Sequence, residues 1–314
     1  MGTGEPRYVV GAHETFAFRT GWLKKGYDAV REDGFAFMRD DAVVRLGVGK
    51  NMVRSIRFWC LATRVVEEQP GPTGSKPLQT TPIGDRLLAD DGWDPYLEDP
   101  ASLWLIHWLL VTNPLRASAW WYLFATYPDN EFTKPQLVSF LQSVVERQQQ
   151  PISAASVARD VDCFLRTYTP SVHAASSVPE ASFDCPLADL ELIRPADADG
   201  VYRFRIGRKE TLPASVIGFA LLQFVRARAP HRRSVALQEC LYAPGSPGQA
   251  FRLDEDSLLH AVDEIASHTH GPLDVVETAG LTQVFLHLDQ IETIDELAFG
   301  LLEQYYRRSS GGDE

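Results

Sequence analysis

The clearest separation of apolar and polar positions lies in residues 47–68, GVGKNMVRSIRFWCLATRVVEE. Gly47 and Gly49 interrupt the regular backbone just before a long periodic run, so we expect a helix that begins near Lys50. At roughly 100° per residue, one side of this helix is apolar. The pattern predicts a helix that continues through the stretch and buries these side chains: Met52, Val53, Ile56, Trp59, Cys60 and Val66.

The opposite side of the predicted helix is basic. By the same helical arithmetic, its cationic side chains fall within roughly 80° of each other. Two interpretations fit this pattern: the solvated face of an ordinary amphipathic helix, or a face that contacts DNA. The second interpretation makes these residues DNA-binding candidates: Lys50, Asn51, Arg54, Arg57 and Arg64.

The segments on either side of this helix favour the DNA interpretation. Residues 20–31 and 40–46 predict two shorter helices before it, separated by an Asp-Gly turn signal. A Pro/Gly-rich loop follows at residues 69–77, then a short β-prone piece and a helix over residues 83–89. Helices, a glycine-containing turn, a basic helix and a flexible hairpin together resemble a winged helix-turn-helix.

We therefore expect a fold that is mainly α with small β elements, made of winged helix-turn-helix type modules plus a helical core. Residues 1–92 are assigned to a winged-helix-like DNA-binding domain, in which Lys24 and Lys25 are further DNA-binding candidates. Residues 93–170 are assigned to a helical domain, and residues 171–314 to a C-terminal α+β domain with an acidic end.

Residues 101–127 are the most hydrophobic part of the chain and are rich in tryptophan. Asn113-Pro114 divides them into two predicted helices. An aromatic platform that stacks bases is one interpretation, but the helical spacing of Trp and Leu favours a buried helical hairpin. A second helical pair over residues 133–169 is either another helix-turn-helix, with Arg159 and Arg166 outside, or a plain bundle segment.

The C-terminal part follows a small, polar linker. Residues 190–193 and 201–206 predict strands around a turn. Apolar periodicity predicts helices over residues 212–228, 257–266 and 291–306.

Charge is distributed unevenly along the chain, which has a net charge of −12. Residues 254–314 contain 14 acidic and 2 basic residues, so the remainder is neutral. The acidity belongs to the C-terminal end, and the N-terminal part is free to carry a local basic patch. The profile is not that of a globally basic protein that coats DNA nonspecifically.

The four cysteines are isolated in the sequence and form no CxxC pair. This favours a reducing, cytoplasmic location over a disulfide framework or a structural zinc site. No apolar run approaches the ~18 residues needed to span a bilayer, so we expect no membrane partner.

No established catalytic signature is present, because the phosphate-binding loop, the GxSxG elbow and the HExxH helix are all missing from the sequence. His13, Glu14 and Arg19 form the best cluster of reactive groups: a base, a carboxylate and a cation of the kinds that phosphodiester cleavage needs. The alternative is that His13 and Glu14 hold the N-terminal segment against the core. His268 and His270 have spacing suited to a metal or are simply exposed.

The N-terminal half also resembles a known family. The runs HETFAFRTGWLKKGYD, over residues 13–28, and AVVRLGVGKNMVRSIRFW, over residues 42–59, are similar to the opening of the SspB family. This bacterial family was long described only as a domain of unknown function, and its members occur beside DNA phosphorothioation and phage-defence genes.

The resemblance implies a DNA nick that opens one strand for sulfur incorporation into the backbone. It also implies double-stranded DNA as substrate and partners of the same system: a cysteine desulfurase, an ATPase and a sulfurtransferase-like protein. A nicking endonuclease of this kind would use a divalent metal, Mg²⁺ or Mn²⁺. The alternative function is a non-catalytic DNA-binding adaptor or transcriptional regulator, and a homodimer is one assembly to consider.

Overall fold

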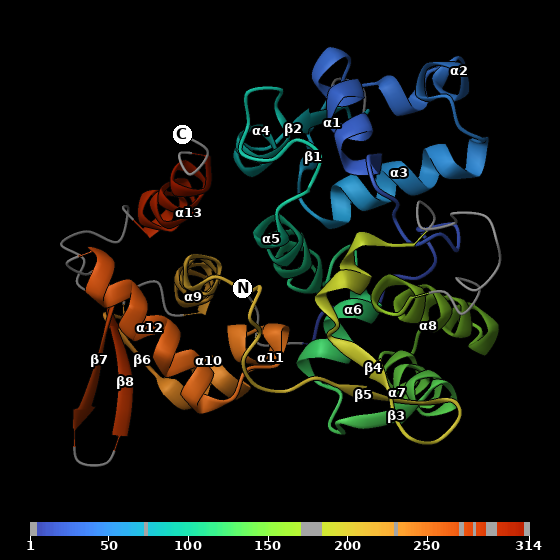
Figure 1. The fold of residues 1–314 in the computed structure, drawn as a ribbon. Coiled ribbons are helices and arrows are strands. Elements are labelled where there is room, and N and C mark those ends of the chain that lie inside the picture. Colours follow the sequence, from blue (N-terminus) through green and yellow to red (C-terminus); the bar gives the residue numbers. More distant parts are fainter. Residues whose placement is uncertain are drawn as a thin grey trace. The chain divides into compact units, whose positions relative to one another are not determined.

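The computed structural model describes residues 5–71, 75–170, 184–228, 232–269, 273–278, 281–286 and 294–310. Within these residues the fold is mostly helical with small antiparallel sheets, as predicted (Figure 1). The chain forms two compact units, Met1–Phe204 and Arg205–Glu314. The predicted domain boundaries near residues 92 and 170 both fall inside the first unit.

The first unit begins with the predicted helices. α1 (Trp22–Glu32), a 3-10 turn (Ala36–Met38), α2 (Ala42–Leu46) and α3 (Lys50–Ala62) follow one another. Strand β1 (Val66–Glu68) then pairs antiparallel with β2 (Leu78–Thr80), and α4 (Pro82–Leu88) follows. Helices α1 and α3 approach closely at Gly26, where an added Cβ would lie 2.4 Å from the Cys60 sulfur.

The prediction that the basic helix continues to Glu68 is wrong at its C-terminal end. α3 stops at Ala62, and the Thr63 hydroxyl donates to the Trp59 carbonyl at 2.7 Å. Arg64 then adopts a left-handed backbone with φ 56°, which an α-helix cannot accommodate. Val66 is buried in strand β1 rather than on a helix face, because the β-branched pair that precedes Glu67 favours extended backbone.

The core of the first unit is the aromatic helical hairpin. α5 (Pro100–Val111) and α6 (Ser118–Ala125) are separated at the predicted Asn113-Pro114 break. Trp104, Trp108 and Trp120 are at most 2% exposed, so the interpretation of this segment as an aromatic platform for bases is wrong and the buried hairpin is confirmed. α3 packs directly against this hairpin, since the Trp59 and Trp120 rings meet edge to face at 5.3 Å.

Two further helices and a small sheet complete the first unit. α7 (Lys134–Arg147) begins at Thr133, whose side chain forms a capping box with Gln136, and α8 (Ala154–Tyr168) begins at Ser153. A 3-10 helix (Pro186–Leu190) leads to a three-stranded antiparallel sheet in the order β3-β5-β4. The strands of this sheet are β3 (Glu131–Thr133), β4 (Ile193–Pro195) and β5 (Val201–Phe204). Strand β3 was not predicted; its pairing with β5 joins the segments on either side of the linker into one unit.

The second unit contains the predicted C-terminal helices, α9 (Ala214–Arg228), α12 (Glu255–Thr269) and α13 (Ile294–Ser310). α9 packs against both others at Gly218, where an added Cβ would lie 2.6 Å from Ile265 and 2.7 Å from Leu301. The sequence pattern did not predict these further elements: β6 (Ser234–Ala236), α10 (Leu237–Tyr242), α11 (Pro247–Phe251), β7 (Leu273–Thr278) and β8 (Leu281–Leu286). The sheet is antiparallel, in the order β6-β8-β7.

All four cysteines are buried and unpaired. Among the described residues, none of the helices combines the length and the hydrophobicity needed to cross a membrane. The side chain of His268 and the whole of His270 lie outside the described residues.

Candidate nucleic-acid interface and the adjoining pocket

The N-terminal half of α3 presents a basic face to solvent. Gly47 takes a left-handed backbone with φ 63° and ends α2, and Gly49 precedes the first residue of α3. Lys50, Asn51 and Arg54 are exposed, while the apolar side of the helix is buried as predicted. Three of the five DNA-binding candidates on this stretch therefore share one accessible face.

Arg57 and Arg64 are directed to partners within the protein. Arg57 donates to Glu68 at 2.7 Å, and Arg116 donates to the other oxygen of the same carboxylate at 2.7 Å. Partial burial acts to raise the pKa of Glu68, but the hydrogen bonds and charges of Arg116 and Arg57 outweigh it and lower that pKa. Arg64 donates to the Thr112 carbonyl at the end of α5, and burial lowers the pKa of its guanidinium to about 10.

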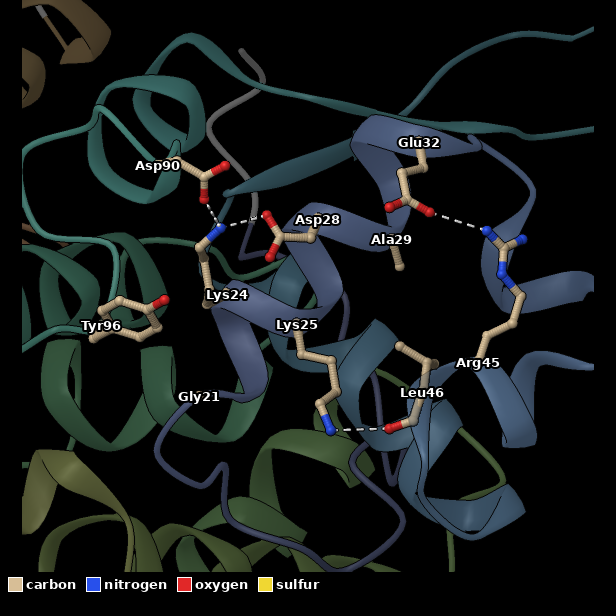
Figure 2. A pocket seen from close by; sticks show the side chains of 10 residues that line it. All are labelled: Gly21, Lys24, Lys25, Asp28, Ala29, Glu32, Arg45, Leu46, Asp90 and Tyr96. Atoms are coloured by element: carbon tan, nitrogen blue, oxygen red, sulfur yellow. Dashed lines mark hydrogen bonds and ion pairs between the residues drawn. The ribbon is translucent and has the colours of Figure 1, made fainter.

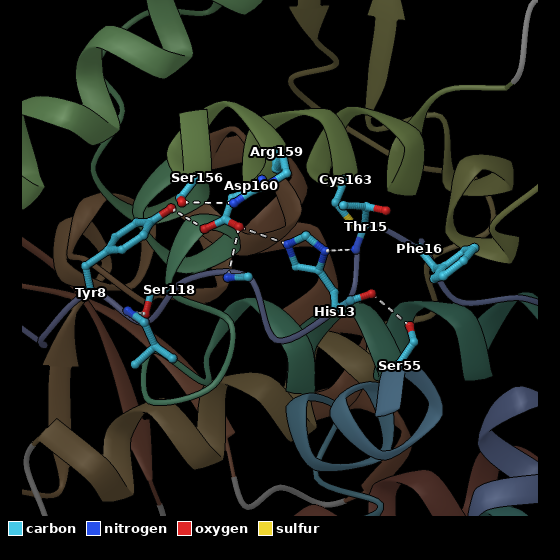
Figure 3. Close-up of polar contacts among 12 residues, drawn as sticks. Tyr8, His13, Thr15, Phe16, Ser55, Ser118, Ser156, Arg159, Asp160 and Cys163 are labelled. Atoms are coloured by element: carbon cyan, nitrogen blue, oxygen red, sulfur yellow. Dashed lines mark hydrogen bonds and ion pairs between the residues drawn. The ribbon is translucent and has the colours of Figure 1, made fainter. Parts of the chain in front are cut away.

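His13 lies at the centre of a buried polar network (Figure 3). The Thr15 N–H donates to His13 Nδ1 at 3.0 Å, so Nε2 carries the proton and donates to Asp160 at 3.0 Å. The same carboxylate accepts from the Tyr8 hydroxyl at 2.8 Å and from the Gly11 N–H at 3.0 Å. With both ring nitrogens engaged and 2% exposure, His13 fastens the N-terminal segment to α8, which favours the structural alternative for this residue.

Glu14 and Thr15 form a turn at the surface beside this network. Both have left-handed backbones, with φ 49° and 66°, which are uncommon in residues other than glycine. Arg54 of α3 lies 3.6 Å from the Glu14 carboxylate, and Arg166 of α8 donates to the Thr15 carbonyl at 2.6 Å. The turn is thus flanked by cations from two helices far apart in the sequence.

Arg19 follows the turn and lies against aromatic rings. Its guanidinium is 5.9 Å from the Phe16 ring centre and 5.6 Å from that of Trp22. This stacking fixes the orientation of a cation in the short segment that joins the turn to α1.

A pocket of about 460 Å³ is lined by residues of α1, the end of α2, Asp90 and Tyr96 (Figure 2). Lys24 is nearly buried in its wall, and its ammonium group lies 2.6 Å from Asp28 and 2.7 Å from Asp90. Burial acts to lower the pKa of Lys24, but the hydrogen bonds and charges of these two carboxylates outweigh it and raise that pKa. Lys25 donates to the Leu46 carbonyl at 2.9 Å, at the C-terminus of α2.

Lys24 and Lys25, which the sequence marks as DNA-binding candidates, thus both have contacts within the protein. Lys24 forms ion pairs with two carboxylates. Lys25 donates a hydrogen bond to a carbonyl at the C-terminal end of α2, where a cation is favourable. Asp28 lies one helical turn after Lys24 in α1, and its pairing was not predicted. The pairings of Lys24 with Asp90 and of His13 with Asp160 span 66 and 147 positions, so the sequence could not indicate them.

Comparison with known proteins identifies the family of this chain. A family described as a protein of unknown function, DUF4007, matches residues 10–306. The chain belongs to this family. No curated protein matches the chain.

Solved structures similar to this DUF4007 protein include a crystal structure of SspB. That structure is 31% identical, has a TM-score of 0.86, and is matched over 98% of this chain and 91% of its own. A magnesium ion-bound SspB crystal structure is also 31% identical with a TM-score of 0.86, over 98% of this chain and 90% of its own. The resemblance noted for residues 13–60 is confirmed and extends over nearly the whole chain.

Proposed function

We propose that this protein is a DNA-binding component of a DNA phosphorothioate modification and phage-defence system, in which it nicks one strand. The observation that carries the proposal is the exposed face of Lys50, Asn51 and Arg54, in a chain similar to SspB over nearly its full length. Its partners would be double-stranded DNA and the sulfur-transferring proteins of the system: a cysteine desulfurase, an ATPase and a sulfurtransferase-like protein.

In this proposal α1, α2, α3 and the β1-β2 hairpin form a winged helix-turn-helix type module. α3 would lie in the major groove with its N-terminal residues toward the bases. Lys50 and Arg54 would contact phosphates, and Asn51 has the donor and acceptor pair suited to adenine. The hairpin after α3 corresponds to the wing.

The turn at Glu14 would extend the contact beyond α3. Arg54 and Arg166 flank this turn, and Arg159 is exposed on the same helix as Arg166. A strand that crosses the turn would meet cations from both helices, which neutralise the charge that develops during phosphodiester cleavage.

For the cleavage itself, Glu14 and Arg19 would act on the DNA strand that is nicked. Glu14 is the partly exposed carboxylate of the turn, and its side chain is 32% accessible. His13 would act as a positioning residue, because its ring holds the turn through Thr15 and Asp160.

The magnesium-bound SspB structure supports a divalent cation, Mg²⁺ or Mn²⁺, as the cofactor of nicking. Among the described residues, no group of three or more His, Cys, Asp or Glu side chains is placed so that it could hold a metal ion. Mg²⁺ commonly takes one or two carboxylates and keeps waters and substrate phosphates as its other ligands. Asp28 and Asp90 are two partly exposed carboxylates of that kind, and both pair with the Lys24 ammonium group. When bound, such an ion activates water and neutralises phosphate charge.

Binding and cleavage of supercoiled plasmid test this function. Lys50→Ala with Arg54→Ala should weaken DNA binding about tenfold or more and reduce its salt dependence, because phosphate contacts release counterions. Arg147→Ala removes an exposed arginine on α7 and is the matched control. Glu14→Gln should abolish nicking with Mg²⁺ or Mn²⁺ and leave binding intact. Unchanged affinity in the double variant, with plasmid left supercoiled by the wild type, would refute the proposal.

A DNA-binding adaptor or transcriptional regulator is the second candidate function. It is favoured by the engagement of both His13 ring nitrogens, which removes the imidazole as a general base. This candidate expects salt-sensitive DNA binding and intact plasmid at high protein and metal concentrations.

A further inference from the structure

Strand β7 forms one edge of the sheet in the second unit (Figure 1). The sheet has the order β6-β8-β7, and within the described residues β7 pairs with β8 and with no other strand. An edge strand carries a row of backbone N–H and C=O groups that can pair with another extended chain. β7 has six residues, whereas β6 at the opposite edge has three, so β7 offers the longer row.

The hydrogen bonds of β8 show which residues of β7 direct their backbone groups inward. The Leu286 N–H donates to the Arg233 carbonyl at 2.8 Å, so the backbone groups of Leu286 point toward β6. This direction alternates along a strand, so the backbone groups of Phe285 point toward β7, where its partner is Asp274. By the same alternation Val276, two positions after Asp274, also bonds to β8.

The intervening residues of β7, Leu273, Val275 and Glu277, therefore direct their N–H and C=O groups to the free edge. An independent contact agrees with this assignment. The Val275 N–H donates to the Asp274 carboxylate at 2.8 Å, so it is not bonded to β8. A short side chain thus occupies an edge position that the carbonyl of an added strand can take.

The surroundings of this edge are acidic. Residues 253–306 contain twelve acidic residues and no lysine or arginine. Asp274 and Glu277 are exposed, and they lie on opposite faces of the sheet because side chains alternate along a strand. α12 packs against β7 and exposes further carboxylates, among them Asp263. A chain that adds to β7 therefore meets negative charge on both faces of the sheet.

This charge selects among the chains that could occupy the edge. A second copy would bring the same acidic segment against this one, and like charges across paired strands are destabilising. A basic extended segment has the opposite charge, and its backbone supplies the missing hydrogen bonds. Asp274 and Glu277 are three positions apart, so basic residues three apart in the segment would lie opposite them in either strand direction.

We propose that β7 is the docking site for a basic, extended segment of a partner protein, which adds to the three-stranded sheet as a fourth strand. The outward backbone groups of Leu273, Val275 and Glu277 would bond to the segment. The carboxylates of Asp274 and Glu277 would pair with its lysine or arginine side chains. This site lies in the second unit and does not depend on the proposed contact of α3 with DNA.

Two fluorescein-labelled peptides test the site on the full-length protein by fluorescence anisotropy. The peptide TKVTKVT carries lysines three positions apart, and TEVTEVT has glutamates in their place. We expect TKVTKVT to bind at least about tenfold more tightly and to be released by added salt. Equal affinity of the two peptides, or no binding of TKVTKVT, would overturn the proposal.

A charge exchange tests whether the peptide binds at this edge. Asp274→Lys with Glu277→Lys should weaken binding of TKVTKVT at least about tenfold and strengthen that of TEVTEVT. Asp197→Lys with Asp199→Lys, at exposed positions of the first unit, is the matched control and should leave both affinities unchanged. Equal effects of the two double variants would assign the binding to overall charge and contradict a site on β7.

Amide hydrogen exchange and sedimentation identify the occupant. In the free protein the Glu277 N–H should exchange faster than the Val276 N–H, and TKVTKVT should slow the exchange of Glu277. Val275→Pro removes an N–H at the free edge and none bonded to β8, so the variant, verified as folded by circular dichroism, should bind TKVTKVT at least about tenfold more weakly. A wild-type dimer in which the Glu277 N–H is already protected would show that a second copy occupies β7, against the proposal.

Discussion

Helices α3 and α12 are followed by similar elements along the chain, yet their exposed faces carry opposite charge. Each is followed in the chain by a two-stranded antiparallel hairpin, β1-β2 after α3 and β7-β8 after α12. The α3 face exposes Lys50, Asn51 and Arg54. The α12 face exposes these side chains: Glu255, Asp256, His260, Asp263 and Glu264. Similar order of elements is thus combined with opposite charge on the exposed face, so we expect the two helices to differ in the partners they can bind.

The two units also use buried charge in opposite ways to fasten irregular segments. In the first unit the Asp160 carboxylate accepts from Tyr8, Gly11 and His13. In the second, the Lys209 ammonium group donates to the Arg252 carbonyl at 2.9 Å and to that of Gly207. In the first unit one buried carboxylate accepts hydrogen bonds from several donors, and in the second unit one buried amino group donates to two carbonyl oxygens.

The largest expected effect comes from breaking the network in the first unit. Asp160→Ala leaves the buried Tyr8 hydroxyl and His13 ring, and the Gly11 N–H, without their acceptor, so the free energy of unfolding should fall by roughly 3–5 kcal/mol. Hydrogen exchange should accelerate at residues 8–15 and remain unchanged in α12. Asp162 lies on the same helix as Asp160, and Asp162→Ala removes a half-exposed ion pair with Lys134 of α7. This change should cost less than about 1 kcal/mol. Equal losses for the two variants would show that the network is not what holds the segment.

The second unit should respond to alkaline pH instead. Burial and the charges of Arg205 and Arg252 lower the pKa of Lys209 to about 7 against the opposing charge of Asp254. Between about pH 7 and the ordinary lysine pKa of ~10.4, the unfolded chain binds more protons than the folded chain, so stability rises with pH.

Lys209→Met should remove this dependence, which amounts to roughly 2–4 kcal/mol over that range. Denaturant unfolding of wild type and variant between about pH 6 and 10 measures it. An identical rise in both proteins would assign the dependence to another group.

A smaller effect is expected at the carboxylate that joins Arg57 and Arg116. Because the pKa of Glu68 is lowered in the folded protein, its contribution is complete above the ordinary glutamate pKa of ~4.3 and is lost as pH falls through the folded value. Glu68→Gln should destabilise the first unit by about 1 kcal/mol at neutral pH and by less in acid. Thermal unfolding at two pH values checks this, and a loss that is independent of pH would contradict it.

The smallest effect tests the comparison of the two faces directly. Asp263→Asn with Glu264→Gln should change DNA affinity by less than about twofold at physiological salt, because the acidic face of α12 does not bind phosphate. The matched change on α3, Lys50→Ala with Arg54→Ala, should weaken binding about tenfold. A similar shift for both pairs, measured by fluorescence anisotropy, would remove the functional distinction between the helices.

Sequence alone was sufficient wherever the deciding contacts are local. The buried and exposed sides of α3 follow from a repeat of three to four residues, and the break at Asn113-Pro114 from the backbone restriction that proline imposes. The start of α7 follows from Thr133 and Pro135 in one turn. Each of these features depends on residues within one or two helical turns.

Tertiary structure alone decided the roles of the candidate site residues. His13 became a buried positioning group because Asp160 lies beside it, 147 positions away. Lys24 pairs with a second carboxylate because Asp90, which follows α4, lies beside α1. The chemistry of a titratable side chain depends on burial and on its partners, and those are set by the path of the chain. The sequence therefore determined the buried and basic sides of α3, and the packing determined which of the charged candidates have partners within the protein.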